Sequence, residues 1–261
     1  TLRDVCIKRI KRSAAGIEVQ VPRLVRTPAA LVRTLDYLVE KIIDADTKVD
    51  PRFLDARRRP RAPTMSEVRA YFWDRARGIS NDWMAQNFQG GGRLSPGLIE
   101  SYERIVRALI IFNYEMSEDE EFVIAFRTTN EEQLNNCLKT VCELYDYARR
   151  TGVPELQSPH EAEFRAYHVL MQMMDNSAKV EMAAFLRKLP GDVIASRDLQ
   201  FAMDVFATVN DNNYIKYFRL VKRATYVQAC LMHRHFVRVR QSALKTINYS
   251  FNPSNGSATL S

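Results

Sequence analysis

Residues 96–110 read PGLIESYERIVRALI and carry the clearest structural pattern in the chain. Proline suits the first turn of a helix, because its φ angle is already helical and the amide proton that it lacks would have no partner there. The apolar residues that follow recur every three or four positions, which is the spacing of one helix face. The stretch therefore predicts a helix that begins at Pro96 and packs inward through Ile99, Tyr102, Val106, Leu109 and Ile110.

The same spacing continues towards the N-terminus. Thr64 and Glu67 stand in the order of a capping box, which predicts the start of a helix that ends before the glycine run at residues 90–92. Thr27 precedes a proline and predicts an N-cap for a helix over residues 28–44. We therefore expect two packed helices before the one that begins at Pro96.

Residues 45–63 interrupt the helical pattern. They include the run Arg57, Arg58, Arg59, Pro60 and Arg61. Such a run predicts an exposed basic linker, and more weakly a nuclear-import signal.

The C-terminal half of the chain also has helical spacing, and no convincing series of strands occurs. Glycine and proline are few and lie mainly at breaks between helical segments. The sequence predicts an all-α fold of stacked helix pairs, in which each pair buries its apolar face on the next. The further expected helices lie near residues 130–150, 159–176, 177–188, 196–208 and 211–228.

Composition is that of a globular protein. The 261 residues are 46% hydrophobic and 26% charged. No apolar run reaches the roughly 18 residues that a membrane-spanning helix needs. We therefore expect a soluble, intracellular protein without a membrane partner.

The sequence offers no catalytic or metal-binding set. Four cysteines lack any Cys-x-x-Cys pair, so buried reduced thiols are expected instead of disulfides or a zinc ribbon. His160 and Glu161 begin like a zinc-protease motif, but Phe164 stands where the second histidine is required. His233 and His235 are two apart on an expected helix and would point to different sides. The glycine run lacks the Lys-Ser/Thr of a phosphate-binding loop. We predict no enzymatic activity and no cofactor.

Charge is distributed in three parts. Residues 1–63 hold 15 Lys or Arg against 8 Asp or Glu, residues 64–210 hold 15 against 22, and residues 211–261 hold 8 against 1. A concentrated basic face attracts phosphate, so basic ends around an acidic middle favour nucleic-acid contact at the ends. Solvated helix faces are the alternative explanation for any single charge.

The last basic segment predicts two amphipathic helices. On the first, we expect Tyr214, Phe218, Val221 and Thr225 to face inward; on the second, Met232, Phe236, Val239, Ala243 and Ile247. The opposite sides would present basic residues that follow a phosphate backbone without reading bases. The candidate nucleic-acid-binding residues are Lys216, Arg219, Arg223, Arg234, Arg238 and Lys245.

Several separated motifs agree in order with one known family. Ser80 departs from the family pattern, which has arginine there, and at the N-terminus Leu2 and Ile7 replace a cysteine and a proline. The matching segments are Arg33–Val39, Trp73–Asp82 with Gln86, Ser101–Val106, Asn130–Leu134 with Leu144 and Tyr145, Glu163–Tyr167, and Asn212–Leu220 continuing to Arg240. Over roughly residues 28–250, the chain resembles the homology domain of GANP-type (SAC/GANP) scaffolds of the second transcription-export complex.

This resemblance implies a PCI-like helical repeat that runs into a winged helix. We expect an N-terminal basic segment over residues 1–27, a helical-repeat domain over 28–210, and basic helices over 211–261 that open the winged helix. We expect the strands and wing of the winged helix either to lie beyond Ser261 or to have diverged, so that this region looks incomplete.

The resemblance also implies a function. It is that of a nuclear messenger-RNA export scaffold, which binds a second PCI-domain subunit, a small acidic proteasome-lid-like protein and RNA, and which links transcription to nuclear-pore components. The alternative is a PCI-type protein-interaction scaffold in splicing, transcription or a proteasome-lid or signalosome-like assembly, without RNA binding.

Overall fold

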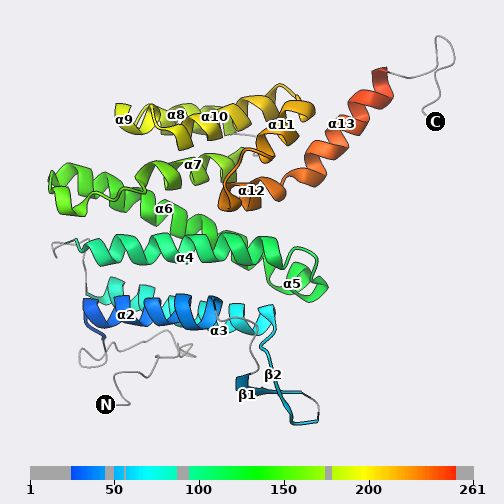
Figure 1. Cartoon of the computed structure of the whole chain (residues 1–261). Coiled ribbons are helices and arrows are strands. Elements are labelled where there is room, and N and C mark those ends of the chain that lie inside the picture. The colour runs from blue at the N-terminus through cyan, green and yellow to red at the C-terminus, as the bar shows by residue number, and fades with distance from the viewer. Residues whose placement is uncertain (1–24, 45–49, 56, 87–93, 174–177, 251–261) are drawn as a thin grey trace, which may run out of the picture. The chain divides into compact units, whose positions relative to one another are not determined.

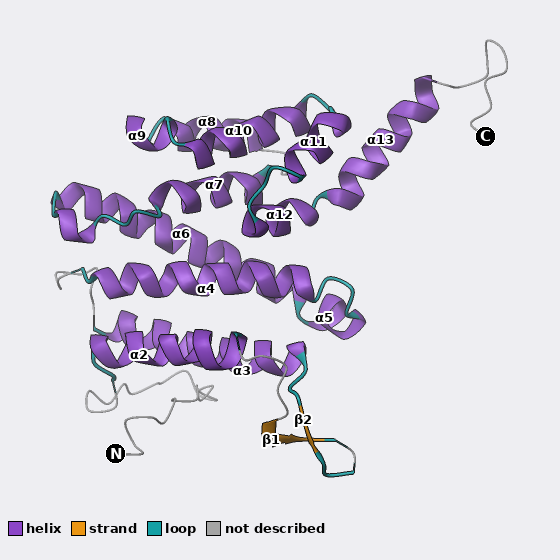
Figure 2. Cartoon of the chain, viewed as in Figure 1, coloured by secondary structure: helices purple, strands orange, loops and turns teal. Residues whose placement is uncertain are grey.

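The computed structural model describes residues 25–44, 50–55, 57–86, 94–173 and 178–250. The chain forms two compact units, residues 1–158 and residues 159–261, and each is described by itself. Helices dominate both units, so the predicted all-α class is confirmed (Figures 1 and 2). The predicted functional division at residues 210 and 211 does not coincide with this boundary and stays a prediction, as do the PCI-like and winged-helix assignments.

Unit 1 is a stack of helices in which α4 lies between the α2–α3 pair and α6 (Figure 1). The helix expected over residues 28–44 is present as α2 with a final π-helical turn, although Thr27 caps it without a side-chain hydrogen bond. The other predicted starts at Thr64 and Pro96 are confirmed. The bounds are α2 Pro28–Leu38, the π-helical turn Val39–Ile43, α3 Met65–Ala85, α4 Pro96–Glu115, α5 Glu120–Ala125, α6 Arg127–Thr151 and a 3₁₀ turn at Pro154–Leu156.

Two polar residues of α4 contact the helices before it. The indole Nε1 of Trp83, on α3, donates a hydrogen bond to Ser101 Oγ at 3.2 Å. Arg104 forms an ion pair with Asp36 of α2. The apolar positions predicted for α4 are buried around these contacts. Polar contacts between packed helices therefore fix the register that apolar packing alone leaves less defined.

A buried carboxylate of α4 accepts a hydrogen bond from α6. Glu103 is only 2% exposed. Its Oε1 accepts hydrogen bonds from the Tyr145 hydroxyl of α6 at 2.6 Å and from Ser158 Oγ at 2.5 Å. Burial and the adjacent Glu103 charge raise the pKa of Tyr145, so its hydroxyl keeps its proton and donates. A buried carboxylate without such donors would be strongly destabilising.

A second buried carboxylate ties α3 to the segment before α2. Asp82 accepts a hydrogen bond from Arg26 Nε at 2.6 Å, and Gln86 Nε2 donates to the carbonyl oxygen of Arg26 at 3.0 Å. Asp82 and Gln86 are thus explained by helix packing alone.

The stretch predicted as a linker contains a two-stranded antiparallel ribbon, β1 (Asp50–Leu54) and β2 (Pro60–Arg61). The predicted exposure is confirmed for residues 57–60, but the strand pairing was not predicted, because strands this short carry no periodic signal. The arginine run forms the turn of the ribbon and its second strand.

Unit 2 packs α7 against α10, with the basic helices beside them. The segment expected as one helix over residues 211–228 is broken into two. Thr225 starts the second of these in a capping box, since its Oγ accepts from the Gln228 amide at 3.4 Å and Gln228 Oε1 accepts from the Thr225 amide at 3.0 Å. The bounds are α7 Glu161–Gln172, α8 Ala178–Leu186, α9 Gly191–Ile194, α10 Arg197–Asn210, α11 Tyr214–Val221, α12 Tyr226–His233 and α13 Phe236–Ser250.

His235 lies between α12 and α13 and joins them to α7. His233 ends α12, so the two histidines are not on one helix as predicted. The ring Nε2 of His235 lies 3.1 Å from the carbonyl oxygen of Leu170, which can only accept, so Nε2 carries the proton. Burial and, next, the positive charge of Arg234 lower the pKa of His235 to about 3. The imidazole is therefore neutral at physiological pH.

Tyr145→Phe removes one donor from the buried Glu103 carboxylate. We expect the free energy of unfolding of unit 1 to fall by about 2 kcal/mol, the usual contribution of a hydrogen bond to a charged group. Urea unfolding followed by tryptophan fluorescence measures this, because both tryptophans, Trp73 and Trp83, are on α3. Tyr147→Phe on the same helix is the matched control and should change stability little. Equal midpoints for both variants would contradict the assignment.

His235→Gln keeps a donor for the Leu170 carbonyl but cannot titrate. The unfolded chain binds a proton near the ordinary histidine pKa and the folded chain does not, so unit 2 loses stability as pH falls below about 6.5. We expect the wild type to lose about 2 kcal/mol more than the variant between pH 7 and pH 5. Urea unfolding by circular dichroism measures the loss, with tryptophan fluorescence as the unit 1 control. Parallel pH dependences would show that His235 is not buried as a neutral ring.

Candidate nucleic-acid interface

Two consecutive asparagines position α11. Asn212 adopts the left-handed conformation, with φ of 53°, which asparagine tolerates better than most residues. Its side chain accepts from Ser242 Oγ at 2.6 Å and donates to Thr246 Oγ1 at 2.9 Å, both on α13. Asn213 caps α11 by accepting from the Lys216 amide at 3.0 Å. The turn therefore starts α11 and fastens it to α13.

An aromatic cluster completes the joint between α11 and α13. The ring centroids of Tyr217 and Phe218 lie 6.1 and 5.3 Å from that of Phe236, in edge-to-face geometry. Burial raises the pKa of Tyr217, whose hydroxyl donates to the Met232 carbonyl at 2.7 Å. The guanidinium of Arg240 lies over the Phe236 ring, 5.3 Å from its centroid. Tyr217 is buried, whereas Phe218 and Phe236 are half-buried, and the three rings pack against one another.

The inward face of α11 differs from the prediction. Tyr217 and Leu220 are its buried residues, whereas Tyr214, Phe218 and Val221 are half-buried. Since successive residues are 100° apart, the buried face is turned by about 100° from the predicted one. The face is turned because Tyr217 packs against Phe236 and donates to the Met232 carbonyl; separately, Thr225, predicted as a core position, is the N-cap of α12.

Five of the six predicted nucleic-acid-binding residues are exposed. Lys216 and Arg219 are on α11, Arg223 follows it, and Arg238 and Lys245 are on α13. Lys216 Nζ lies 3.9 Å from an Asp204 carboxylate oxygen, between side chains about half exposed, so this ion pair is weak. Among the described residues, Arg219, Arg223 and Lys245 form no ion pair.

Arg234 is placed differently from the prediction. It caps the C-terminus of α12, is half-buried, and its guanidinium contacts the sulfur of Met171. This contact joins residues that are 63 positions apart, so the helical spacing of one segment does not predict it. Arg234 is therefore not one of the exposed basic residues.

The structure adds exposed basic residues that the sequence reasoning missed. Lys222 is next to Arg223, and Arg240 is on α13. Both belong to the same basic segment, so its charge excess could have indicated them. Arg197, at the start of α10, is far from that segment in sequence and had no such signal.

Arg197 and Arg223 line one pocket of about 670 Å³ between α10 and the turn into α12. Its walls also carry Asp198 and Asp204. Asp198 accepts a hydrogen bond from Gln228 Nε2 at 3.2 Å, which ties α12 to α10. The charges of the lining are balanced, so the pocket does not extend the basic surface.

The cysteines that the structure describes are part of the packed core. Cys137, Cys142 and Cys230 are buried thiols that form no disulfide, as predicted for them, and burial raises the pKa of Cys137 to about 12. In the part of the chain that the structure describes, no three His, Cys, Asp or Glu side chains could hold a metal ion. The glycine run and most of residues 1–27 lie outside that part. Searching the described helices finds none that is long and apolar enough to span a membrane.

Comparison with known proteins identifies the family. The SAC3/GANP family profile matches residues 1–261. The chain is 26% identical over 268 residues to SAC3 family protein 1 of Schizosaccharomyces pombe, covering 95% of this chain and 23% of that protein. Identity is 27% to Protein xmas of Drosophila melanogaster, over 90% of this chain and 10% of the relative, and 27% to SAC3 family protein B of Arabidopsis thaliana, over 95% and 14%. The chain thus spans less than a quarter of these relatives, and the match along its whole length shows that it belongs to the SAC3/GANP family.

Proposed function

We propose that this chain is the scaffold segment of a nuclear messenger-RNA export complex and that it holds RNA through the basic residues of α11 and α13. The observation that supports this most directly is the charge of residues 211–261, where eight basic residues stand against one acidic residue. Phosphate groups are the natural counterions of such a surface. The packed helices of each unit would supply the frame that holds these basic residues in place.

The basic residues favour backbone contact without base reading. Arg219 on α11, Arg223 in the turn after it and Lys245 on α13 are exposed, and the neighbouring aromatic rings are used in packing. Contacts to phosphate position a protein but carry little sequence information. We therefore propose salt-dependent RNA binding with weak sequence preference.

The wider role rests on the family. We propose a second PCI-domain subunit and a small acidic proteasome-lid-like protein as partners, with location in the nucleus at nuclear-pore components. The chain covers only a small part of its relatives' length. The proposed location therefore rests on the family and not on the described residues.

A second candidate function is a protein-interaction scaffold without RNA binding. Val237 and Leu244 support it, because each is 65% exposed and they stand seven residues apart on α13. That spacing places both side chains on one helix face. Exposed apolar residues on one face are typical of a protein-binding surface.

For the RNA-binding proposal, the test variant is Arg219→Glu, Arg223→Glu and Lys245→Glu in the full chain. We expect weaker binding to a labelled oligouridylate, and a log Kd against log salt slope reduced by about 0.7 for each phosphate that is no longer bound. Fluorescence anisotropy measures both. The matched control reverses three exposed charges elsewhere, Lys139→Glu, Arg187→Glu and Lys188→Glu. Equal decreases in both variants, or none in the first, would refute the proposed surface.

For the protein-interaction proposal, the variant is Val237→Asp with Leu244→Asp. We expect at least a tenfold decrease in copurification of a coexpressed PCI-domain subunit, because charge would enter an apolar contact. Ile124→Asp with Val180→Asp is the control, since both residues are exposed and apolar on other helices. Circular dichroism should show unchanged helicity. Undiminished copurification would remove this face from the partner surface.

A further inference from the structure

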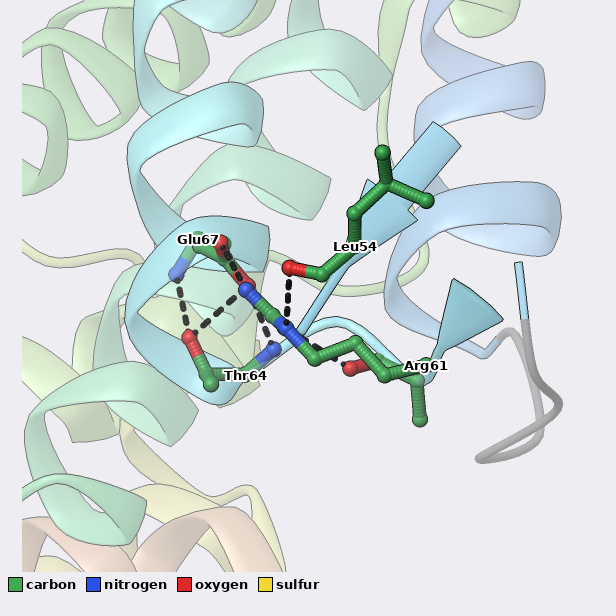
Figure 3. A network of polar contacts seen from close by, with 5 residues as sticks. Leu54, Arg61, Thr64 and Glu67 are labelled. Atoms are coloured by element: carbon green, nitrogen blue, oxygen red, sulfur yellow. Dashed lines mark hydrogen bonds and ion pairs between the residues drawn. The ribbon is translucent and has the colours of Figure 1, made fainter. Parts of the chain in front are cut away.

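The β1–β2 ribbon is fastened to α3 by one arginine (Figure 3). The two terminal nitrogens of Arg61 donate to the two carboxylate oxygens of Glu67 at 2.7 and 2.6 Å. Arg61 Nε also donates to the Leu54 carbonyl of β1 at 3.3 Å. Glu67 in turn accepts from the Thr64 amide at 2.8 Å within the capping box. One side chain thus connects both strands to the first turn of α3.

The ion pair is held firmly. The Arg61 guanidinium and, next, the Thr64 amide lower the pKa of Glu67 to about 2, so the pair stays ionised throughout the physiological range. Two parallel hydrogen bonds from a guanidinium to a carboxylate also fix orientation. The base of the ribbon therefore has a defined position on α3.

The turn of the ribbon is built around Asp55. Its Oδ1 accepts from the amides of Arg57 and Arg59 at 2.8 Å each, and its Oδ2 accepts from Arg59 Nε at 2.9 Å. Arg58 has φ of 59°, and its amide donates to the Asp55 carbonyl at 2.9 Å. One carboxylate thereby organises a turn that carries three consecutive arginines.

These contacts divide the arginines into two groups. Arg59 and Arg61 pair with Asp55 and Glu67. Arg57 and Arg58 are exposed, and neither forms an ion pair within the part of the chain that the structure describes. Arg57 and Arg58 thus present two exposed guanidinium groups at the tip of a ribbon whose base is attached to α3.

The residue types indicate a phosphate ligand. Every basic residue from 50 to 61 is arginine, whose planar guanidinium matches phosphate geometry better than lysine does. The described tip of the ribbon, Arg57 to Pro60, is exposed and carries three guanidinium groups. Protein interfaces have an apolar centre, and nucleic-acid interfaces are strongly basic.

We propose that the β1–β2 ribbon is a second RNA-contacting element, in which Arg57 and Arg58 bind backbone phosphates separately from the basic residues of α11 and α13. This inference deepens the proposed RNA-binding function and rests on it. It places RNA contact in unit 1 as well as in unit 2.

The test uses the full chain and a labelled oligouridylate. Arg57→Gln with Arg58→Gln removes two charges and leaves the paired arginines in place. We expect affinity at low salt to fall about tenfold, and the log–log salt slope to decrease by about 1.4 for two phosphates that are no longer bound. Lys139→Gln with Arg150→Gln removes two exposed charges from α6 and should change neither quantity.

A second measurement locates the RNA without any variant. Phenylglyoxal modifies exposed arginines, and mass spectrometry compares its yield at each position with and without RNA. Protection of Arg57 and Arg58 together with Arg219 and Arg223 supports both the ribbon and the proposed function. Protection at the ribbon alone supports the ribbon and overturns the α11 surface. Protection at Arg219 and Arg223 alone overturns the ribbon and leaves the proposed function. No protection, with unchanged affinity in the ribbon variant, overturns both.

Discussion

The buried carboxylate of Glu103 is the constraint on which unit 1 depends. A carboxylate with 2% exposure is tolerable only if its oxygens are satisfied, and the Tyr145 and Ser158 hydroxyls supply the donors. Two residues earlier in the same helix, Ser101 accepts from the Trp83 indole. One short motif of α4 therefore orients a helix on each side of it. These residues lie in a segment that resembles a family motif, and in the structure they make packing contacts between helices.

Much of the fold could be predicted from the sequence because its signals are local. The capping box at Thr64 and the proline at position 96 mark helix starts that need no tertiary information. The break before α12 was also readable, since Thr225 and Gln228 form a second capping box, but continuous apolar spacing concealed it. The ribbon gave no comparable signal. Its pairing depends on the Arg61 contact with Glu67 and on a turn organised by Asp55.

The basic charge of the candidate site could be predicted from the sequence, whereas the positions of its side chains could be predicted only in part. An excess of basic residues identified the segment, and five of the six residues are exposed. Arg234 could not be placed, because its contact with Met171 joins residues that are distant in sequence. The inward face of α11 was also wrong, because burial of Tyr217 depends on Phe236 and the Met232 carbonyl. Side-chain partners across helices decide such details, and one helix's periodicity does not contain them.

Few buried residues attach α13 to the rest of unit 2. Of its 15 residues only Val239 and Ala243 are buried, and the two hydrogen bonds that join Asn212 to it, one accepted from Ser242 and one donated to Thr246, are exposed. Local opening requires least free energy where little apolar area is buried and most of the hydrogen bonds that break are exposed to solvent. Detaching α13 would therefore require less free energy than separating α7 from α10. Arg238, Arg240 and Lys245 lie on this helix, so in the proposed function their spacing could adapt to a curved or irregular polyanion.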